Sequence, residues 1–195
     1  MVDTAAKSDC KELVPNLFQR ISPSVVLISA ISINPFKLME RFAASMGSGF
    51  IFSSKGLILT NSHVVFGRRA IVVTLDDGQT VQAELLGADP LLDLAVLRIP
   101  VASKDLPVAT MGDSDSLRVG EEVFALGNPF GLGHTLTRRV VSGLNRILPI
   151  SPMSMTVPMI QTDAAINPGN SGGASHEPLW RIALHIHCML TKMNG

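Results

Sequence analysis

Short apolar segments rich in β-branched residues recur through most of the chain and are separated by turn-forming residues. Because helical patterns are few, their spacing of about 8 to 12 residues predicts an all-β sandwich or barrel. Residues 53–56 (Ser-Ser-Lys-Gly) separate two such segments and indicate a hairpin. The predicted strands are residues 25–31, 49–52, 57–60, 70–75, 80–86, 94–99, 123–126, 135–141 and 159–162.

The segments between these strands divide the chain into a polar start and two halves. Residues 1–12 are expected to be loose, and residues 13–20 to form a short helix or an extended arm. We expect residues 34–46 to be a loop, because Pro35 interrupts the pattern, and residues 100–105 to connect the halves. The proline-rich residues 149–158 form a surface loop that either gates a site or only connects.

Composition places the chain among folded globular proteins. Of its 195 residues, 46% are hydrophobic and the mean hydropathy is +0.33, which excludes a disordered chain and favours one domain with a sizeable core. The formal net charge is 0, so no binding to nucleic acid or to an anionic membrane is indicated. We expect no secretory signal, no transit peptide and no membrane span, because the start lacks their patterns and the apolar runs are short.

Residues 166–173 (Ile-Asn-Pro-Gly-Asn-Ser-Gly-Gly) have a composition suited to close approach of another chain. Pro168 restricts the backbone, and glycine admits conformations that leave room for a ligand. Such a loop can expose the Ser171 hydroxyl and direct the amides of Gly169 and Ser171 toward a developing oxyanion. A simple tight turn has the same composition, so the choice depends on whether the chain also supplies a base and an acid.

His63 and Asp93 supply the two missing groups. His63 follows an apolar strand, which holds a side chain rigidly while its tip reaches a cleft. Asp93 stands between leucines at the start of another strand, so we expect it to be buried and to need a donor such as a histidine Nδ1–H. Asp89, beside Pro90, fits the alternative role of capping a turn. The order His63, Asp93, Ser171 is the chymotrypsin order of a catalytic triad.

These segments resemble the HtrA/Deg (protease Do-like) family of serine proteases over residues 16–174. The resemblance implies a trypsin-like double β-barrel, with residues 1–15 as a flexible N-terminal segment, residues 16–195 as the protease domain and the barrels dividing near 100–106. The segments that carry the resemblance are Gly-Ser-Gly-Phe-Ile (47–51), residues 59–65 with Thr-Asn-Ser-His (60–63), residues 89–97 with Asp-Leu-Ala-Val-Leu (93–97), residues 117–121, residues 125–131 with Gly-Asn-Pro-Phe-Gly (127–131), residues 141–143, and residues 161–173 with Gly-Asn-Ser-Gly-Gly (169–173).

The family implies ATP-independent endoproteolysis of unfolded or damaged proteins, without a cofactor, in a cleft between the barrels. His63 is then the general base, Asp93 its orienting acid and Ser171 the nucleophile, with the Gly169 and Ser171 amides as the oxyanion hole. The resemblance also implies homo-trimers built through the N-terminal segment, and a location in the periplasm or in an organelle such as the chloroplast or mitochondrion.

The chain departs from the family after Gly173. Only 24 residues (195 − 171) follow Ser171, so we expect no PDZ domain and an incomplete second barrel, to which residues 181–190 add at most one strand. His185 and His187 share a face of that strand, but two ligands without a third do not make a zinc site, and we expect no metal.

The remaining departures concern single residues and the function. Cys10 and Cys188 match no metal or redox spacing, and two free thiols are favoured over a disulfide. Arg138 and Arg139 replace a small or apolar pair and are expected to be solvated. An active protease is favoured. The alternatives are a truncated paralogue that binds unfolded chains or a partner subunit without cutting them, and an unrelated β-sandwich binding module.

Overall fold

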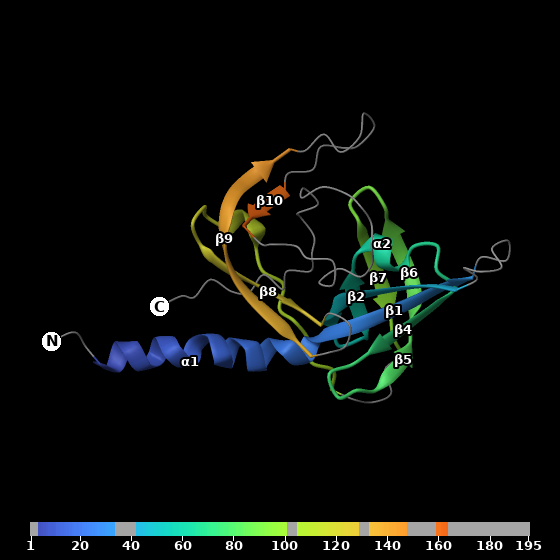
Figure 1. Ribbon diagram of the computed structural model, residues 1–195, viewed down its shortest axis with the longest axis horizontal. Helices are drawn as coiled ribbons and strands as arrows, with labels where there is room; N and C mark the ends of the chain where they lie inside the picture. Colours follow the sequence, from blue (N-terminus) through green and yellow to red (C-terminus); the bar gives the residue numbers. More distant parts are fainter. Residues whose placement is uncertain (1–3, 34–41, 101–104, 129–132, 148–158, 164–195) are drawn as a thin grey trace.

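Two antiparallel β-sheets form the protein, and the computed structural model describes residues 4–33, 42–100, 105–128, 133–147 and 159–163 (Figure 1). The larger sheet has seven strands in the order β5-β4-β1-β2-β3-β7-β6, and the smaller has three in the order β10-β9-β8. This confirms the all-β class. The strands of the first sheet are β1 (Val25–Ile33), β2 (Phe42–Ser53), β3 (Leu57–Thr60), β4 (Ala70–Thr74), β5 (Thr80–Gln82), β6 (Glu84–Asp89) and β7 (Leu94–Arg98).

The first sheet is curled around its own core. Alternate residues of β3 and β4 are buried, as the period of two along a strand requires. The fully buried side chains at the centre of this core are Ile28, Ile51, Ile58 and Leu97. The edge strands β5 and β6 are separated in the chain by Ala83 alone, so the two edges of the sheet are brought close together.

The second sheet, among the described residues, consists of β8 (Glu122–Gly127), β9 (Thr135–Arg146) and β10 (Met159–Thr162). The long strand β9 curves across the sheet in Figure 1 and pairs with β8 along its first half and with β10 along its second. Three described strands agree with the expected incomplete second barrel.

A second apolar cluster joins the two sheets. Its buried members come from the end of the N-terminal helix, from β1 and β2, from the connector and from β8. We call it the intersheet cluster, and it consists of Ile21, Val25, Phe50, Ala109 and Leu126. Leu136 of β9 packs against it, as do Phe52 and Leu59 of the first sheet.

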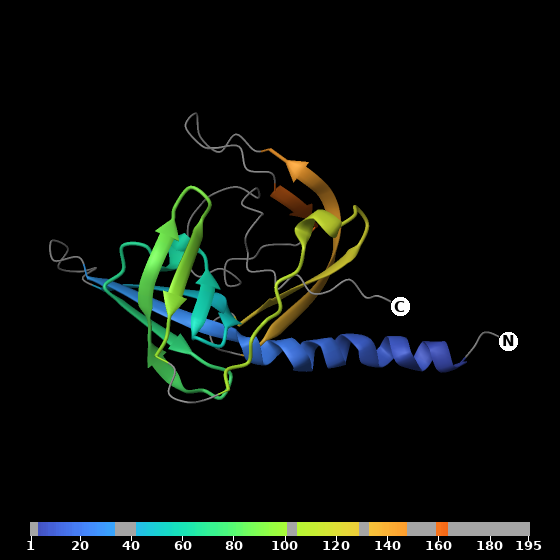
Figure 2. The ribbon, with the colours of Figure 1, turned by 180° about the vertical axis from the view of Figure 1, so that it is seen from behind.

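The N-terminal helix α1 (Thr4–Ile21) differs from the expected loose start. The sequence here includes two alanines, two lysines, two leucines and one glutamate, whose high helix propensity favours this conformation. Pro15 lies inside the helix and removes one backbone hydrogen bond without ending it. Figures 1 and 2 show α1 extending away from both sheets, and the contacts described for its side chains with the intersheet cluster come from its C-terminal end, where Leu17 and Phe18 pack against the cluster and Ile21 belongs to it.

Two predicted segments differ from those observed. Residues 42–46, expected in a loop, belong to β2, because β1 pairs with it as far as Ile33 opposite Phe42. The strand predicted over residues 80–86 is two strands, β5 paired with β4 and β6 paired with β7. Ala83 separates them and donates its N–H to the Ile71 carbonyl, 2.9 Å away.

The arginine pair on β9 is only partly solvated as expected. Arg138 is exposed and pairs with Glu122 on β8, and the hydrogen bond that Arg138 donates to this carboxylate raises the pKa of Arg138 above its ordinary value. Arg139 is half-buried instead, because its position opposite Val123 places it on the more enclosed side of the strand pair. No helix in the described part of the chain is long and apolar enough to cross a membrane.

Candidate active site

His63 lies on the single-turn helix α2 (Ser62–Val65), directly after β3. The turn buries Ser62, Val64 and Val65. His63 is the one residue of the turn that is not buried, so its imidazole projects from a well-packed turn toward solvent.

Two residues of β2 hold α2 close against that strand. The Ser45 hydroxyl donates to the Val64 carbonyl over 2.7 Å. A Cβ on Gly47 would lie 2.6 Å from Val64 Cγ2, closer than real contacts allow, so only glycine lets β2 approach the turn this closely. The Gly-Ser-Gly segment therefore supports the element that carries His63.

Asp93 occupies the turn between β6 and β7 in a left-handed conformation, with φ of 55°. Asp89 caps this turn, as expected, because its Oδ1 accepts the N–H groups of Leu91 and Leu92. The left-handed residue directs both the Asp93 carbonyl and its carboxylate toward α2. The carbonyl accepts the Ser62 N–H over 3.1 Å.

His63 and Asp93 form a direct pair. His63 Nδ1 lies 2.7 Å from Asp93 Oδ2, and the His63 backbone N–H donates to Asp93 Oδ1 over 2.9 Å. With the proton on Nδ1, the ring donates to the carboxylate and Nε2 keeps a free lone pair, as a general base requires. The two side chains are 36% and 28% exposed, so Asp93 is half-buried rather than buried as expected, because it lies in a surface turn and not within β7.

Asn61 is a member of this site that sequence reasoning missed. Its buried amide donates to the Asp93 carbonyl at 3.1 Å and lies 3.3 Å from Asp93 Oδ2. It thereby fixes the backbone and the carboxylate of Asp93 with one side chain. Its place two residues before His63 at a strand end was the only available signal.

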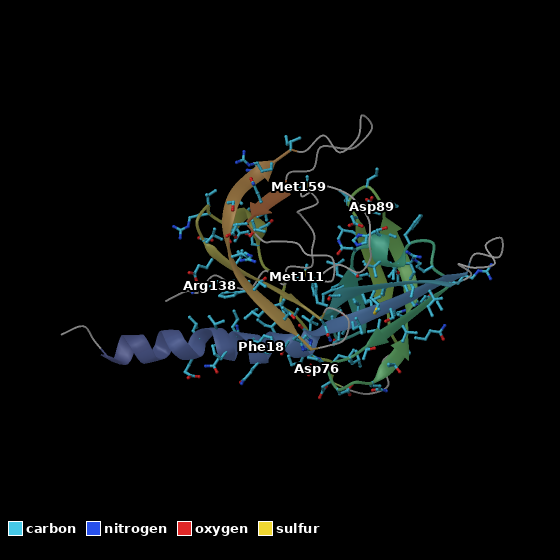
Figure 3. All side chains as sticks on the ribbon, in the orientation of Figure 1. Phe18, Asp76, Asp89, Met111, Arg138 and Met159 are labelled. Carbon is cyan, nitrogen blue, oxygen red and sulfur yellow. The ribbon has the colours of Figure 1, made fainter. Side chains whose placement is uncertain are left out.

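The chain has two further histidines, His134 and His176, beside the candidate residues named so far, and the structure describes His134 alone among the residues that remain. His134, just before β9, directs Nε2 toward the Val25 carbonyl (3.1 Å) and Nδ1 toward Asp76 (3.5 Å), and Phe18 packs edge-on against its ring. It therefore joins α1, β1 and β9, and Figure 3 shows Phe18 and Asp76 at that junction. Gly169, Ser171, His176, His185, His187 and Cys188 lie outside the described residues.

Metal binding has no candidate in the described residues, where no three His, Cys, Asp or Glu side chains gather around one point.

Two antiparallel sheets, with a histidine–aspartate pair at a strand end of the first, define the class of trypsin-like peptidases. Residues 47–182 match the family described as a trypsin-like peptidase domain. Among curated relatives, the "Probable periplasmic serine endoprotease DegP-like" of Halomonas elongata is 53% identical over 129 residues, which are 66% of this chain and 26% of that protein. The protein of the same name from Pseudomonas putida (strain GB-1) is 52% identical over 134 residues, covering 69% and 27%.

Solved structures agree with this class. The crystal structure of Deg5 superposes with a TM-score of 0.68 at 41% identity, covering 85% of this chain and 79% of that one. The HtrA-type protease AlgW with tripeptide gives a TM-score of 0.66 at 41% identity, covering 82% and 49%. The chain therefore belongs to the HtrA/Deg family of trypsin-like serine proteases. It spans about a quarter of the length of the two curated relatives, 26% and 27%.

Proposed function

We propose that this chain is a serine endopeptidase that works through a Ser171–His63–Asp93 triad and an acyl-enzyme intermediate. The observation that carries the proposal is the His63–Asp93 pair, with Nδ1 2.7 Å from the carboxylate and Nε2 left available. To act as a general base, this histidine needs a third group that gives up a proton to Nε2. Ser171, in its Gly-Asn-Ser-Gly-Gly loop, is the residue we assign to that role.

In the proposed reaction, Ser171 Oγ attacks the scissile carbonyl carbon while His63 Nε2 takes the hydroxyl proton. Asp93 stabilises the resulting imidazolium through Nδ1–H, and the Gly169 and Ser171 amides bind the carbonyl oxygen as it becomes negative. Collapse of the tetrahedral intermediate breaks the C–N bond, and the leaving amine receives the proton from His63. Water, deprotonated by the same imidazole, then hydrolyses the acyl-enzyme and restores Ser171.

The substrate class that we propose is the unfolded or damaged polypeptide, in line with the family to which the chain belongs. An extended chain is what a scissile bond between two sheets requires, because a folded segment cannot lie flat in such a position. Assembly into trimers through the N-terminal segment and a periplasmic location are part of the same proposal, the latter because relatives carry periplasmic names.

The test is active-site labelling with a fluorophosphonate probe. We expect the wild-type chain to be labelled, and Ser171→Ala and His63→Ala to remain unlabelled with unchanged circular dichroism. Ser53→Ala, at the hairpin of β2, is the control and should label like wild type.

Absence of labelling in the folded wild-type chain would refute the proposal. If wild type and Ser171→Ala then suppressed aggregation of an unfolded protein equally, without cleaving casein, a binding role without cutting would replace it.

A further inference from the structure

A single hydrogen bond crosses from the first sheet to the end of β8. Asn128, the residue after β8, donates its backbone N–H to the Ser48 hydroxyl over 2.9 Å. Ser48 lies in β2 and is 80 residues away in the chain. Both residues are half-buried, so solvent competes weakly for this bond.

Ser48 is held in place from both sides. A Cβ on Gly47 would meet Val64 at 2.6 Å, and one on Gly49 would meet Ile28 and Ile58 at 2.6 and 2.9 Å. The residue before Ser48 is therefore packed against α2, and the residue after it is packed against the core of the first sheet. The Ser48 hydroxyl is presented at a position that has little freedom to shift.

Ser48 is also connected to the His63–Asp93 pair. Its carbonyl accepts the hydroxyl of Thr60 over 2.9 Å, and Thr60 is 0% exposed at the end of β3. The next residue, Asn61, binds Asp93. A continuous path of covalent and hydrogen bonds thus runs from Asn128 through Ser48 and Thr60 to the carboxylate that orients His63.

The second sheet is one hydrogen-bonded unit, because β9 pairs with both β8 and β10. By chain order, β10 ends at Thr162, nine residues (171 − 162) before Ser171. A constraint on the end of β8 is therefore a constraint on the sheet that precedes Ser171 in the chain.

We propose that Ser48 is a positioning residue, whose hydroxyl fixes the end of β8 against β2 and so sets how the second sheet lies relative to the His63–Asp93 pair. The inference rests on the proposed function. A misplacement of about 1 Å between catalytic groups can lower turnover about 100-fold.

The experiment compares Ser48→Ala with Ser48→Thr, which keeps the hydroxyl, and with Ser53→Ala. Ser53 is a matched control, because its Oγ also accepts a single backbone N–H, that of Lys55 at 3.2 Å, on the same strand. We measure kcat and KM on a peptide substrate, the fluorophosphonate labelling rate, the melting temperature and the hydrogen-exchange rate of the Asn128 amide.

For Ser48→Ala we expect kcat and the labelling rate to fall about 10-fold or more at nearly constant KM, and Asn128 exchange to rise about 10-fold. Ser48→Thr should restore most of the kcat, the labelling rate and the slow Asn128 exchange, and Ser53→Ala should match wild type.

Equal Asn128 exchange in Ser48→Ala and Ser53→Ala would overturn the hydrogen bond itself. Faster exchange with unchanged kcat would overturn the positioning role. A wild-type chain that is neither labelled nor active, but shows the exchange difference, would refute the proposed function and leave the Ser48–Asn128 contact standing.

Discussion

Asp93 illustrates at the scale of one residue how a strained backbone serves a site. A left-handed φ of 55° is unfavourable for most L-residues, and aspartate and asparagine tolerate it best. In this conformation the carbonyl and the carboxylate of one residue both face α2, where Ser62, Asn61 and His63 donate to them. An extended residue would direct the two groups apart. The strain is therefore offset by hydrogen bonds that also orient His63.

Replacement of Asp93 by asparagine separates charge from conformation. Asp93→Asn retains tolerance of the left-handed backbone, so we expect the melting temperature to fall only slightly. The amide favours the wrong tautomer of His63, and kcat should fall about 10⁴-fold, as in the chymotrypsin triad. Peptide hydrolysis at saturating substrate measures the effect. A kcat within about tenfold of wild type would exclude Asp93 as the orienting acid.

At the scale of elements, the close packing of α2 against β2 predicts that alanine substitution has different effects at two glycines. Gly47→Ala places a methyl group 2.6 Å from Val64 Cγ2, whereas the same change at Gly87 in β6 meets nothing within 4 Å. We expect Gly47→Ala to destabilise the fold by about 1–3 kcal/mol and to lower kcat, because α2 carries His63. Gly87→Ala should stay within about 0.5 kcal/mol of wild type. Urea unfolding and peptide hydrolysis measure both, and equal effects of the two variants would contradict the role of Gly47.

The attachment of α1 makes a second prediction at this scale. Phe18 packs against His134 and the intersheet cluster, whereas Leu13, one turn and more toward the N-terminus, is exposed. Because Phe18 is only half-buried, we expect Phe18→Ala to cost about 1–3 kcal/mol, less than a fully buried phenylalanine. Leu13→Ala is the control and should cost little. Similar urea midpoints for the two variants would show that α1 is not anchored through Phe18.

The elements also show what the sequence could and could not predict. The Ser53–Gly56 turn is local, and the hairpin that it predicted is present, with the Gly56 N–H bound to the Ser53 carbonyl at 3.0 Å. The break at Ala83 depends on β4 and β7 as partners, and no local signal marks it. In the site, His63 and Asp93 were recognisable from their flanking residues. The roles of Asn61 and Ser48 depend on which atoms face them after the sheets have formed, so sequence alone did not reveal them.

At the scale of the whole molecule, the intersheet cluster couples the two sheets. Leu126 of β8 is 6% exposed and packs with residues of β1, β2 and α1. We expect Leu126→Ala to lower the free energy of unfolding by about 2–5 kcal/mol. Because both sheets share the cluster, the variant should still unfold in one transition, with equal calorimetric and van't Hoff enthalpies. Two separate transitions would show that the sheets are independent units.

Among the described residues, the strand pairing of the first sheet lies within residues 25–98, and this has a consequence for the order of assembly. A chain leaving the ribosome holds every partner of that sheet once Arg98 has emerged. The apolar surface around Val25 and Phe50 stays partly uncovered until Ala109 and Leu126 follow. During refolding, pulse-labelled hydrogen exchange should therefore protect amides of β3 and β7 before those of β8, and simultaneous protection would contradict this order. Between those two events the nascent chain exposes an apolar surface at which it can aggregate.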